Sequence, residues 1–210
     1  MRITEIFFSI QGEGTRAGRP CVFVRFTGCD LRCAWCDTAY AFAGGVERSR
    51  PEILAEVARH PSRFVLLTGG EPTLQPELPQ LARELLDRGY EVAVETHGQR
   101  PLGGLPREVI RIADVKTPGS GEVARDLSWL AGLQPHDEVK FVVDSEADWR
   151  WSLEVIRAER LEGRVAILVS PVQGKVDPRD AARWILASGV DARLNLQLHK
   201  IVWGAEARGV

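Results

Sequence analysis

Three of the four cysteines lie within eight residues of one another, in the spacing CxxxCxxC: Cys29, Cys33 and Cys36. Thiolates are soft ligands that bind iron–sulfur clusters and zinc. A structural zinc site and a fully ligated cluster each take four protein ligands, whereas the fourth cysteine, Cys21, lies in a predicted strand, as a packed core thiol does. Three ligands on a four-iron cluster leave one iron open to bind a small molecule, which indicates an enzyme. The alternatives are three buried or surface thiols without a metal, and a zinc site with three cysteines and either His97 or His199.

A second motif follows a later predicted strand, with the sequence Thr68-Gly69-Gly70-Glu71-Pro72. Glycine lets a backbone approach a ligand closely, and a carboxylate accepts hydrogen bonds from an ammonium group. A turn of this kind also forms for purely conformational reasons. The motif therefore indicates a ligand site only in combination with the cysteine motif that precedes it. Together the two motifs resemble the radical S-adenosylmethionine (SAM) superfamily. In that superfamily the open iron chelates SAM, and one electron cleaves SAM to give a 5′-deoxyadenosyl radical.

Further motifs extend the resemblance over essentially the whole chain: Ile10-Gln11-Gly12-Glu13-Gly14, Arg25, Cys36-Asp37-Thr38 and Gln197-Leu198-His199-Lys200. In this combination the chain resembles the 7-carboxy-7-deazaguanine synthase family. The resemblance implies a lyase that converts 6-carboxy-5,6,7,8-tetrahydropterin to 7-carboxy-7-deazaguanine with loss of ammonia, in queuosine-type 7-deazapurine biosynthesis. The implied chemistry is hydrogen abstraction at C6 followed by Mg-assisted ring contraction. The implied cofactors are a 4Fe-4S cluster, SAM and Mg²⁺; the implied partners are a flavodoxin or ferredoxin as electron donor and a second copy of the chain in a homodimer.

The chemistry of a pterin matches particular side chains. Gln11 offers both donors and acceptors, Glu13 accepts from ring N–H groups, and Arg25 binds a carboxylate through two parallel hydrogen bonds. The alternatives are a solvated turn for Gln11 and Glu13 and an exposed strand charge for Arg25. In the family the C-terminal carboxylate reaches the substrate, which would make Val210 a ligand. By resemblance, the substrate-binding residues are Ile10, Gln11, Gly12, Glu13, Arg25, Thr68, His199 and Val210.

The resemblance also assigns the metal and SAM contacts. Thr38 would bind Mg²⁺, which takes oxygen ligands, and its alternative is a helix N-cap. Trp35 would pack near the adenine, and its alternative is a core side chain. His199 has the alternative of a core residue on an apolar strand. The residues expected to bind SAM are Trp35, Cys36, Asp37, Gly70, Glu71, Lys116, Thr117, Pro118, Ser170, Pro171, Val172 and Gln173.

Strand-like and helical patterns alternate along the chain, which is typical of βαβ units around a mainly parallel sheet. Short apolar stretches predict strands at 2–8, 21–26, 63–67, 91–94, 109–112, 139–143, 165–169 and 192–196. Amphipathic patterns predict helices at 51–58, 75–87, 147–160 and 177–187. A complete eight-unit barrel takes about 250 residues, so the length favours a partial one. We expect an α/β fold: a partial barrel of about six parallel strands with reduced helices, and the site at the carboxyl ends of the strands.

The composition is that of an ordinary globular protein, with 44% apolar and 27% charged residues. The net charge of −2 argues against direct binding to nucleic acid or to a membrane surface. No apolar run approaches the roughly 18 residues of a membrane helix, and the first residues do not resemble a signal peptide. We therefore expect a single cytoplasmic domain over residues 1–210. Two other functions stay open: a glycyl-radical activase, which shares both the cysteine and the Gly-Gly-Glu-Pro motifs, and a non-catalytic iron–sulfur or zinc module.

Overall fold

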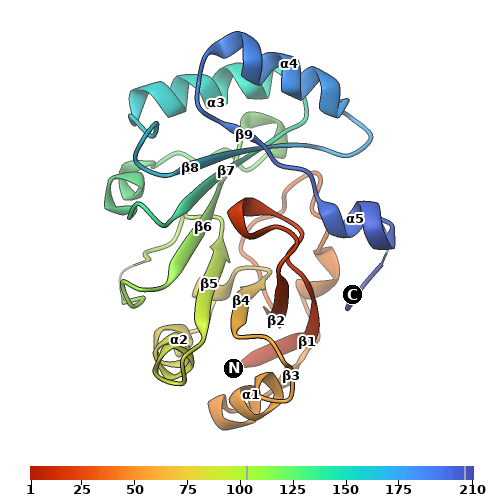
Figure 1. Ribbon diagram of the computed structural model, residues 1–210, viewed down its shortest axis with the longest axis vertical. Helices are drawn as coiled ribbons and strands as arrows, with labels where there is room; N and C mark the ends of the chain where they lie inside the picture. Colours follow the sequence, from red (N-terminus) through yellow and green to blue (C-terminus); the bar gives the residue numbers. More distant parts are fainter. Residues whose placement is uncertain (103, 206) are drawn as a thin grey trace.

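The computed structural model describes residues 1–102, 104–205 and 207–210, and its strands form one sheet in the order β3-β1-β2-β4-β5-β6-β7-β8-β9 (Figure 1). Its centre consists of parallel strands: β2 (Pro20–Phe26), β4 (Phe64–Gly69), β5 (Glu91–Thr96), β6 (Ile110–Val115), β7 (Glu138–Val143) and β8 (Ala166–Pro171). At one edge, β1 (Arg2–Ile10) runs antiparallel to both β2 and β3 (Val46–Glu47), and at the other β9 (Arg193–Leu194) runs parallel to β8. The sheet does not close, so the expected partial barrel of about six parallel strands is confirmed, with the two-residue β9 as a seventh.

Four of the helices follow the predicted amphipathic patterns and cover the outside of the sheet: α1 (Arg50–Val57), α2 (Leu78–Asp87), α3 (Glu146–Ala158) and α4 (Pro178–Ser188). Local chemistry sets their ends. At the start of α1, Glu52 accepts hydrogen bonds from both the backbone and the hydroxyl of Ser49, as in a capping box. In α4, Asp177 caps the first turn by accepting from the Arg179 N–H, and Gly189 ends the helix at φ +72°, a conformation that favours glycine.

The two faces of the sheet carry different chemistry because side chains alternate along a strand. On β2, Val22, Val24 and Phe26 pack outward in a core that includes α1 and α2. A second outer core joins β7 and β8 to α3 and α4, and Figure 1 shows the two helix pairs at opposite ends of the curved sheet. On the inner face, Cys21 and Phe23 form part of a small apolar layer, and Arg25 follows them at the carboxyl end. The inner face is therefore apolar at one end of the strands and polar at the other.

Two connections that lack an α-helix explain how the fold fits in 210 residues. The described part of the link from β5 to β6 contains no helix, and the link from β6 to β7 contains only the short 3-10 turns η4 (Pro118–Ser120) and η5 (Ser128–Gly132). The expected reduction of the helices is thus observed. No helix in the described ranges has both the length and the apolar character needed to cross a membrane.

The C-terminal segment differs from the prediction. The strand expected at 192–196 is only the two-residue β9, and the following segment forms a helix that the sequence did not predict, α5 (Leu198–Trp203). This helix is only six residues long and has no buried residue, so it is shorter than the window of roughly 11–18 residues over which apolar periodicity predicts a helix. The placement of His199 on an apolar strand is therefore wrong, because His199 lies on α5.

Candidate active site

A cavity of about 300 Å³ opens on the inner face of the sheet at the carboxyl ends of the strands, where parallel α/β folds bind their ligands. Alternate residues of successive strands point into it: Phe23 and Arg25 from β2, Leu66 and Thr68 from β4, Glu95 from β5, Ile112 and Asp114 from β6, Lys140 and Val142 from β7, and Ser170 from β8. Because each of the six central parallel strands contributes, the cavity is formed by the sheet as a whole. Its polar lining indicates ligands that carry charges or hydrogen-bonding groups.

The three cysteines of the CxxxCxxC motif line one end of this cavity, on the loop that follows β2. The glycine pair after β4 supports this loop at very short range. A Cβ atom at Gly70 would lie 2.0 Å from the carbonyl oxygen of Gly28, and the Glu71 N–H donates to the same oxygen over 2.7 Å. Only glycine permits this approach, so the two motifs are joined physically as well as in pattern.

The cysteines suit an iron–sulfur cluster better than a single zinc ion. Zinc ligands converge on one point at about 2.0–2.3 Å from the metal. In the described residues, the one group of three potential ligand atoms within 4.8 Å of each other is Cys29, Asp30 and His97; Cys33 and Cys36 do not join it. Thiols that surround a larger volume fit a multi-atom cluster.

His97 is not available as a fourth metal ligand. Its Nδ1 accepts a hydrogen bond from the Gln99 N–H at 3.1 Å, which places the proton on Nε2. That proton faces Asp30, whose Oδ1 is 3.0 Å away, and Glu71, whose Oε2 is 3.3 Å away. Both ring nitrogens are thus engaged within the protein. The other cysteine, Cys21, is fully buried in β2, where burial raises its pKa to about 12, as expected for a core thiol.

Glu71 is fully buried and does not line the cavity. Its carboxylate accepts from the backbone N–H and hydroxyl of Thr73 at 3.0 and 2.6 Å. It also accepts from the Thr96 hydroxyl at 2.8 Å and the His97 N–H at 2.9 Å. These contacts fill the roughly four acceptor positions of a carboxylate. In this structure Glu71 therefore joins the ends of β4 and β5 and does not face a ligand.

The other residues predicted to contact SAM fall into two groups. Most of them line the cavity: Trp35, Cys36, Asp37, Gly70, Lys116, Ser170, Pro171, Val172 and Gln173. Trp35 is half-buried at its rim, with the Lys175 ammonium 5.5 Å from the ring centroid, so it is not a core side chain. Thr117 is fully buried behind the wall, where its hydroxyl donates to Val142 O and lies 3.0 Å from Asp148. Pro118 is exposed and also lies off the cavity wall.

All the residues predicted to bind the substrate line the cavity: Ile10, Gln11, Gly12, Glu13, Arg25, Thr68, His199 and Val210. Gln11 is only 4% exposed and Glu13 is half-buried, which rules out a solvated turn. Arg25 is also half-buried, and its Nε donates to Glu5 Oε1 over 2.7 Å. Tyr40 donates to the same oxygen of Glu5 over 2.8 Å, so Arg25 is a fixed pocket cation and not an exposed strand charge.

Lys140, which the sequence analysis did not single out, lies within a group of charged side chains. Its ammonium donates to Glu13 Oε2 at 2.9 Å and to Glu95 Oε1 at 2.5 Å. Asp114 lies 3.8 Å away and pairs with Lys116 at 2.8 Å. One signal in the sequence points to this group, because the chain has only four lysines among 27 basic residues. Three of them, Lys116, Lys140 and Lys200, line the cavity.

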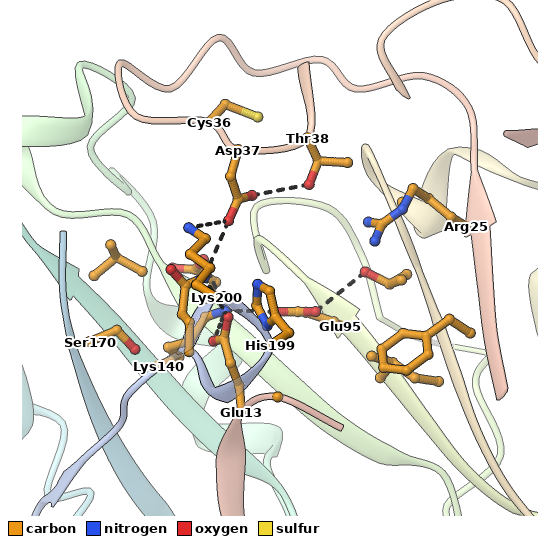
Figure 2. Close-up of a pocket in the computed structure, with 18 of the residues that line it drawn as sticks. Glu13, Arg25, Cys36, Asp37, Thr38, Glu95, Lys140, Ser170, His199 and Lys200 are labelled. Atoms are coloured by element: carbon orange, nitrogen blue, oxygen red, sulfur yellow. Dashed lines mark hydrogen bonds and ion pairs between the residues drawn. The ribbon is translucent and has the colours of Figure 1, made fainter. Parts of the chain in front are cut away.

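Helix α5 and the residue before it, Gln197, connect the cysteine loop to the loop after β1, which carries Glu13 (Figure 2). Lys200 pairs with Asp37 at 2.9 Å, and Gln197 donates to both Asp37 and Glu13, at 3.2 and 2.7 Å. The Lys200 ammonium and these hydrogen bonds outweigh desolvation and hold the pKa of Asp37 well below its ordinary value. The Thr38 hydroxyl donates to Asp37 over 3.0 Å and makes no cap hydrogen bond. Its lone pairs are therefore not used by the helical turn that follows.

His199 faces the same region from α5. Burial outweighs the nearby carboxylates, Glu13 first among them, and lowers the pKa of His199 below its ordinary value. The imidazole is therefore neutral near pH 7, with one nitrogen to donate and one to accept. Figure 2 shows it between Glu13 and Glu95, on the side of the pocket opposite Arg25.

Comparison with known proteins gives consistent results. The model of the radical SAM superfamily matches residues 23–121, which include both motifs. A 7-carboxy-7-deazaguanine synthase from Koribacter versatilis (strain Ellin345) is 45% identical over 226 residues, covering all of both chains. Another, from Chlorobaculum tepidum, is 40% identical over 214 residues, covering 100% of this chain and 97% of the relative.

Solved structures share the fold. QueE from Escherichia coli matches with a TM-score of 0.77 at 24% identity, over 94% of each chain. SuiB from Streptococcus suis, bound to the precursor peptide SuiA, matches with a TM-score of 0.62 at 16% identity, over 83% of this chain and 47% of SuiB. The partial barrel described above is thus the one found in these proteins.

Proposed function

Because the chain belongs to the 7-carboxy-7-deazaguanine synthase family, radical SAM lyases of queuosine biosynthesis, we propose that it converts 6-carboxy-5,6,7,8-tetrahydropterin to 7-carboxy-7-deazaguanine and ammonia. The observation that carries the proposal is that one cavity holds both the thiols and the polar groups suited to the substrate. It has three thiols at one end and an Arg25 cation, a Glu13 carboxylate and a buried Gln11 amide in its wall. A glycyl-radical activase acts on a protein backbone and has no use for such a set, and the comparisons do not favour that alternative.

The residues present suit the cofactors of this family. Cys29, Cys33 and Cys36 would hold a 4Fe-4S cluster with one open iron. Burial raises the pKa of the Cys29 and Cys33 thiols, a cost that ligation to iron offsets because the metal binds the thiolate form. When bound, the cluster and SAM supply the radical that takes a hydrogen atom from C6 of the substrate.

The placement of the cavity residues supports the proposed contacts to SAM. Gly70 keeps its loop close enough to the cysteine loop for backbone groups to reach the amino-acid part of SAM. Lys116 offers a cation for the carboxylate of SAM, and Trp35 offers an aromatic face at the rim for the adenine. Ser170, Pro171, Val172 and Gln173 form the wall at the end of β8. Glu71, by contrast, acts by holding the β4 and β5 ends together.

The protein's own part in the reaction is to bind, orient and shield the pterin. Arg25 offers its terminal guanidinium nitrogens to the substrate carboxylate, in the two-pronged geometry that such anions favour. Gln11 and Glu13 match the donors and acceptors of the pterin ring, with Thr68 and His199 beside them. Thr38 offers an oxygen to Mg²⁺, a hard cation that retains several waters, and Asp37 orients that hydroxyl.

Two partners complete the proposal. A small flavodoxin or ferredoxin would supply the electron, and two copies of the chain would form a homodimer; both come from the family resemblance.

Anaerobic turnover tests the proposal. Reconstituted protein receives a reductant, SAM, Mg²⁺ and 6-carboxytetrahydropterin, and mass spectrometry follows the products. Formation of 7-carboxy-7-deazaguanine without net consumption of SAM is the expected result. Reductive cleavage of SAM with no deazapurine would refute the substrate while keeping the superfamily, and a colourless protein that binds zinc would refute both.

A further inference from the structure

The Lys140 ammonium lies at the centre of a buried charge group in the pocket wall, and Lys140 is only 5% exposed. It is 2.9 Å from Glu13 Oε2 and 2.5 Å from Glu95 Oε1. Glu13 comes from the loop after β1 and Glu95 from β5, so Lys140 on β7 joins three parts of the chain that lie far apart in the sequence. Figure 2 shows the three side chains converging on the floor of the pocket.

No other cation serves these two carboxylates. Lys116 pairs with Asp114 instead, at 2.8 Å. Among the described residues, Lys140 is the one lysine or arginine with a nitrogen within 4.0 Å of Glu13 or of Glu95. Two half-buried carboxylates that share a site repel one another. Removal of the shared cation would leave their partly buried negative charge uncompensated, which is unfavourable.

Glu13 and Glu95 retain capacity to accept further hydrogen bonds. A carboxylate accepts about four in total. Glu13 receives three, from Lys140, Asn195 and Gln197, and Glu95 receives two, from Lys140 and Thr68. Both line the cavity, so the unused positions suit a ligand edge that carries several N–H donors, as a guanidine-like edge does.

We propose that Lys140 is a positioning residue for the substrate: it keeps Glu13 ionised and holds Glu13 and Glu95 in orientation, so that both accept N–H donors from the guanidine-like edge of the pterin. This inference rests on the proposed function. It gives Lys140 no contact with the reacting atoms and predicts that its effect appears in substrate binding rather than in cleavage of SAM.

The electrostatics of the group support this role. Burial opposes ionisation of Glu13, but Lys140 outweighs it and holds the pKa of Glu13 below its ordinary value. Burial likewise disfavours the charged form of Lys140, but Glu13, Glu95 and Asp114 outweigh it and raise the pKa of Lys140 well above its ordinary value. Other titratable or charged groups face this cluster from neighbouring elements: Asp37 from the cysteine loop, Asp114 from β6, Lys116 directly after β6, and His199 and Lys200 from α5.

The test measures binding of 6-carboxypterin, an oxidised and unreactive analogue, to the reconstituted holoenzyme with SAM at a series of pH values from 6 to 9. The variants are Lys140→Met, which removes the charge, and Lys140→Arg, which retains it. Each affinity is divided by the wild-type affinity at the same pH, so ionisation of the ligand itself cancels. For Lys140→Met we expect at least a tenfold loss at pH 6–7 that diminishes as the pH rises, because a higher pH ionises Glu13 again. For Lys140→Arg we expect a ratio that is independent of pH, even where the larger side chain weakens binding.

The outcomes separate this inference from the proposed function. A Lys140→Met ratio that is near one, or equally low at every pH, would overturn the positioning role, since a purely structural defect does not titrate. If Lys140→Met yields no folded, cluster-loaded protein, Lys140→Gln replaces it, because glutamine keeps two donors but no charge. Failure of the wild-type enzyme to convert the pterin would instead refute the proposed function, whatever the Lys140 variants show.

Discussion

At the scale of single residues, Arg25 illustrates how a cation on a buried strand is held in the orientation that binds an anion. Its neighbours on β2, Val24 and Phe26, are fully buried in the outer core, so the backbone of this strand is fixed. Glu5 on the adjacent strand takes the Arg25 Nε, and in the described residues no hydrogen bond is made by either terminal nitrogen. The guanidinium is thus oriented by one carboxylate and retains its two-pronged edge for another.

Arg25→Ala should abolish pterin turnover while leaving reductive cleavage of SAM intact, because Arg25 serves the substrate and not SAM. Loss of one partner of a buried, hydrogen-bonded charge pair costs about 2–5 kcal/mol, which corresponds to roughly 30-fold or more in affinity. Anaerobic assays of deazapurine and of 5′-deoxyadenosine measure the two activities separately. Arg183→Ala, on the exposed face of α4, is the matched control. Pterin turnover that persists in Arg25→Ala would contradict the assignment of this residue.

At the scale of elements, the sequence predicts those whose stability is local or periodic. The strands and α1 to α4 were found because apolar side chains recur with period two or 3.6 and because caps such as Asp177 and Gly189 mark their ends. Helix α5 could not be found this way. It is six residues long with no buried side chain, and distant polar groups hold it in place: Gly12, Glu13 and Asp37.

The same division applies to the site. Short motifs in the sequence identify the cysteines, the glycine pair, Gln11, Glu13 and Arg25 without knowledge of the fold. Lys140 and Glu95 belong to no short motif, and only the fold, which places β5 and β7 on either side of β6, brings their charged atoms to within 2.5 Å of each other. Glu71 shows the converse, since its motif suggested a ligand contact and its four internal donors give it a structural place instead.

The position of α5 depends on the absence of a side chain at Gly12. The Leu198 N–H donates to Gly12 O at 2.9 Å, and a Cβ at Gly12 would lie 2.3 Å from His199 Nδ1. Gly12→Ala should therefore displace α5, lower pterin affinity and expose the bond after Lys200 to trypsin, with little change in the helix content of the protein. Limited proteolysis followed by mass spectrometry measures this exposure.

A second substitution checks the cause of that displacement. In Gly12→Ala/His199→Ala the imidazole is gone, so resistance to trypsin should return. Gly132→Ala is the control, because a Cβ at Gly132 meets no atom within 4 Å. Equal susceptibility of the single and double variants would show that contact with His199 is not what sets the position of α5.

At the scale of the whole molecule, polar contacts join parts of the chain that strand pairing does not connect. The loop after β1 reaches across to β7, where Glu138 accepts from the N–H and hydroxyl of Thr15 and pairs with Arg16 at 2.8 Å. The same loop binds the segment after β9, because Asn195 accepts from the Gly14 N–H at 2.8 Å. The loop after β1 is thereby joined to β7 and to the segment after β9, next to the cavity residues Glu13 and Gln197.

From this arrangement we propose that residues 1–210 unfold as one domain, although the outer core is divided between two clusters. The continuous pairing of β4 through β8 and the contacts to Glu138 should couple the clusters, and a single domain normally unfolds in one transition.

The tryptophans of the core report on the second cluster only: Trp129, Trp149, Trp151 and Trp184. Urea unfolding followed by their fluorescence should therefore coincide with unfolding followed by far-UV circular dichroism, and the slowest amides of β4 and β8 should exchange with the same free energy of opening. In Glu138→Ala the loop loses its anchor, and both transitions should move together to lower urea. Separate midpoints in the wild-type protein would mean that the two clusters are independent folding units and that the pocket between them forms only after they dock.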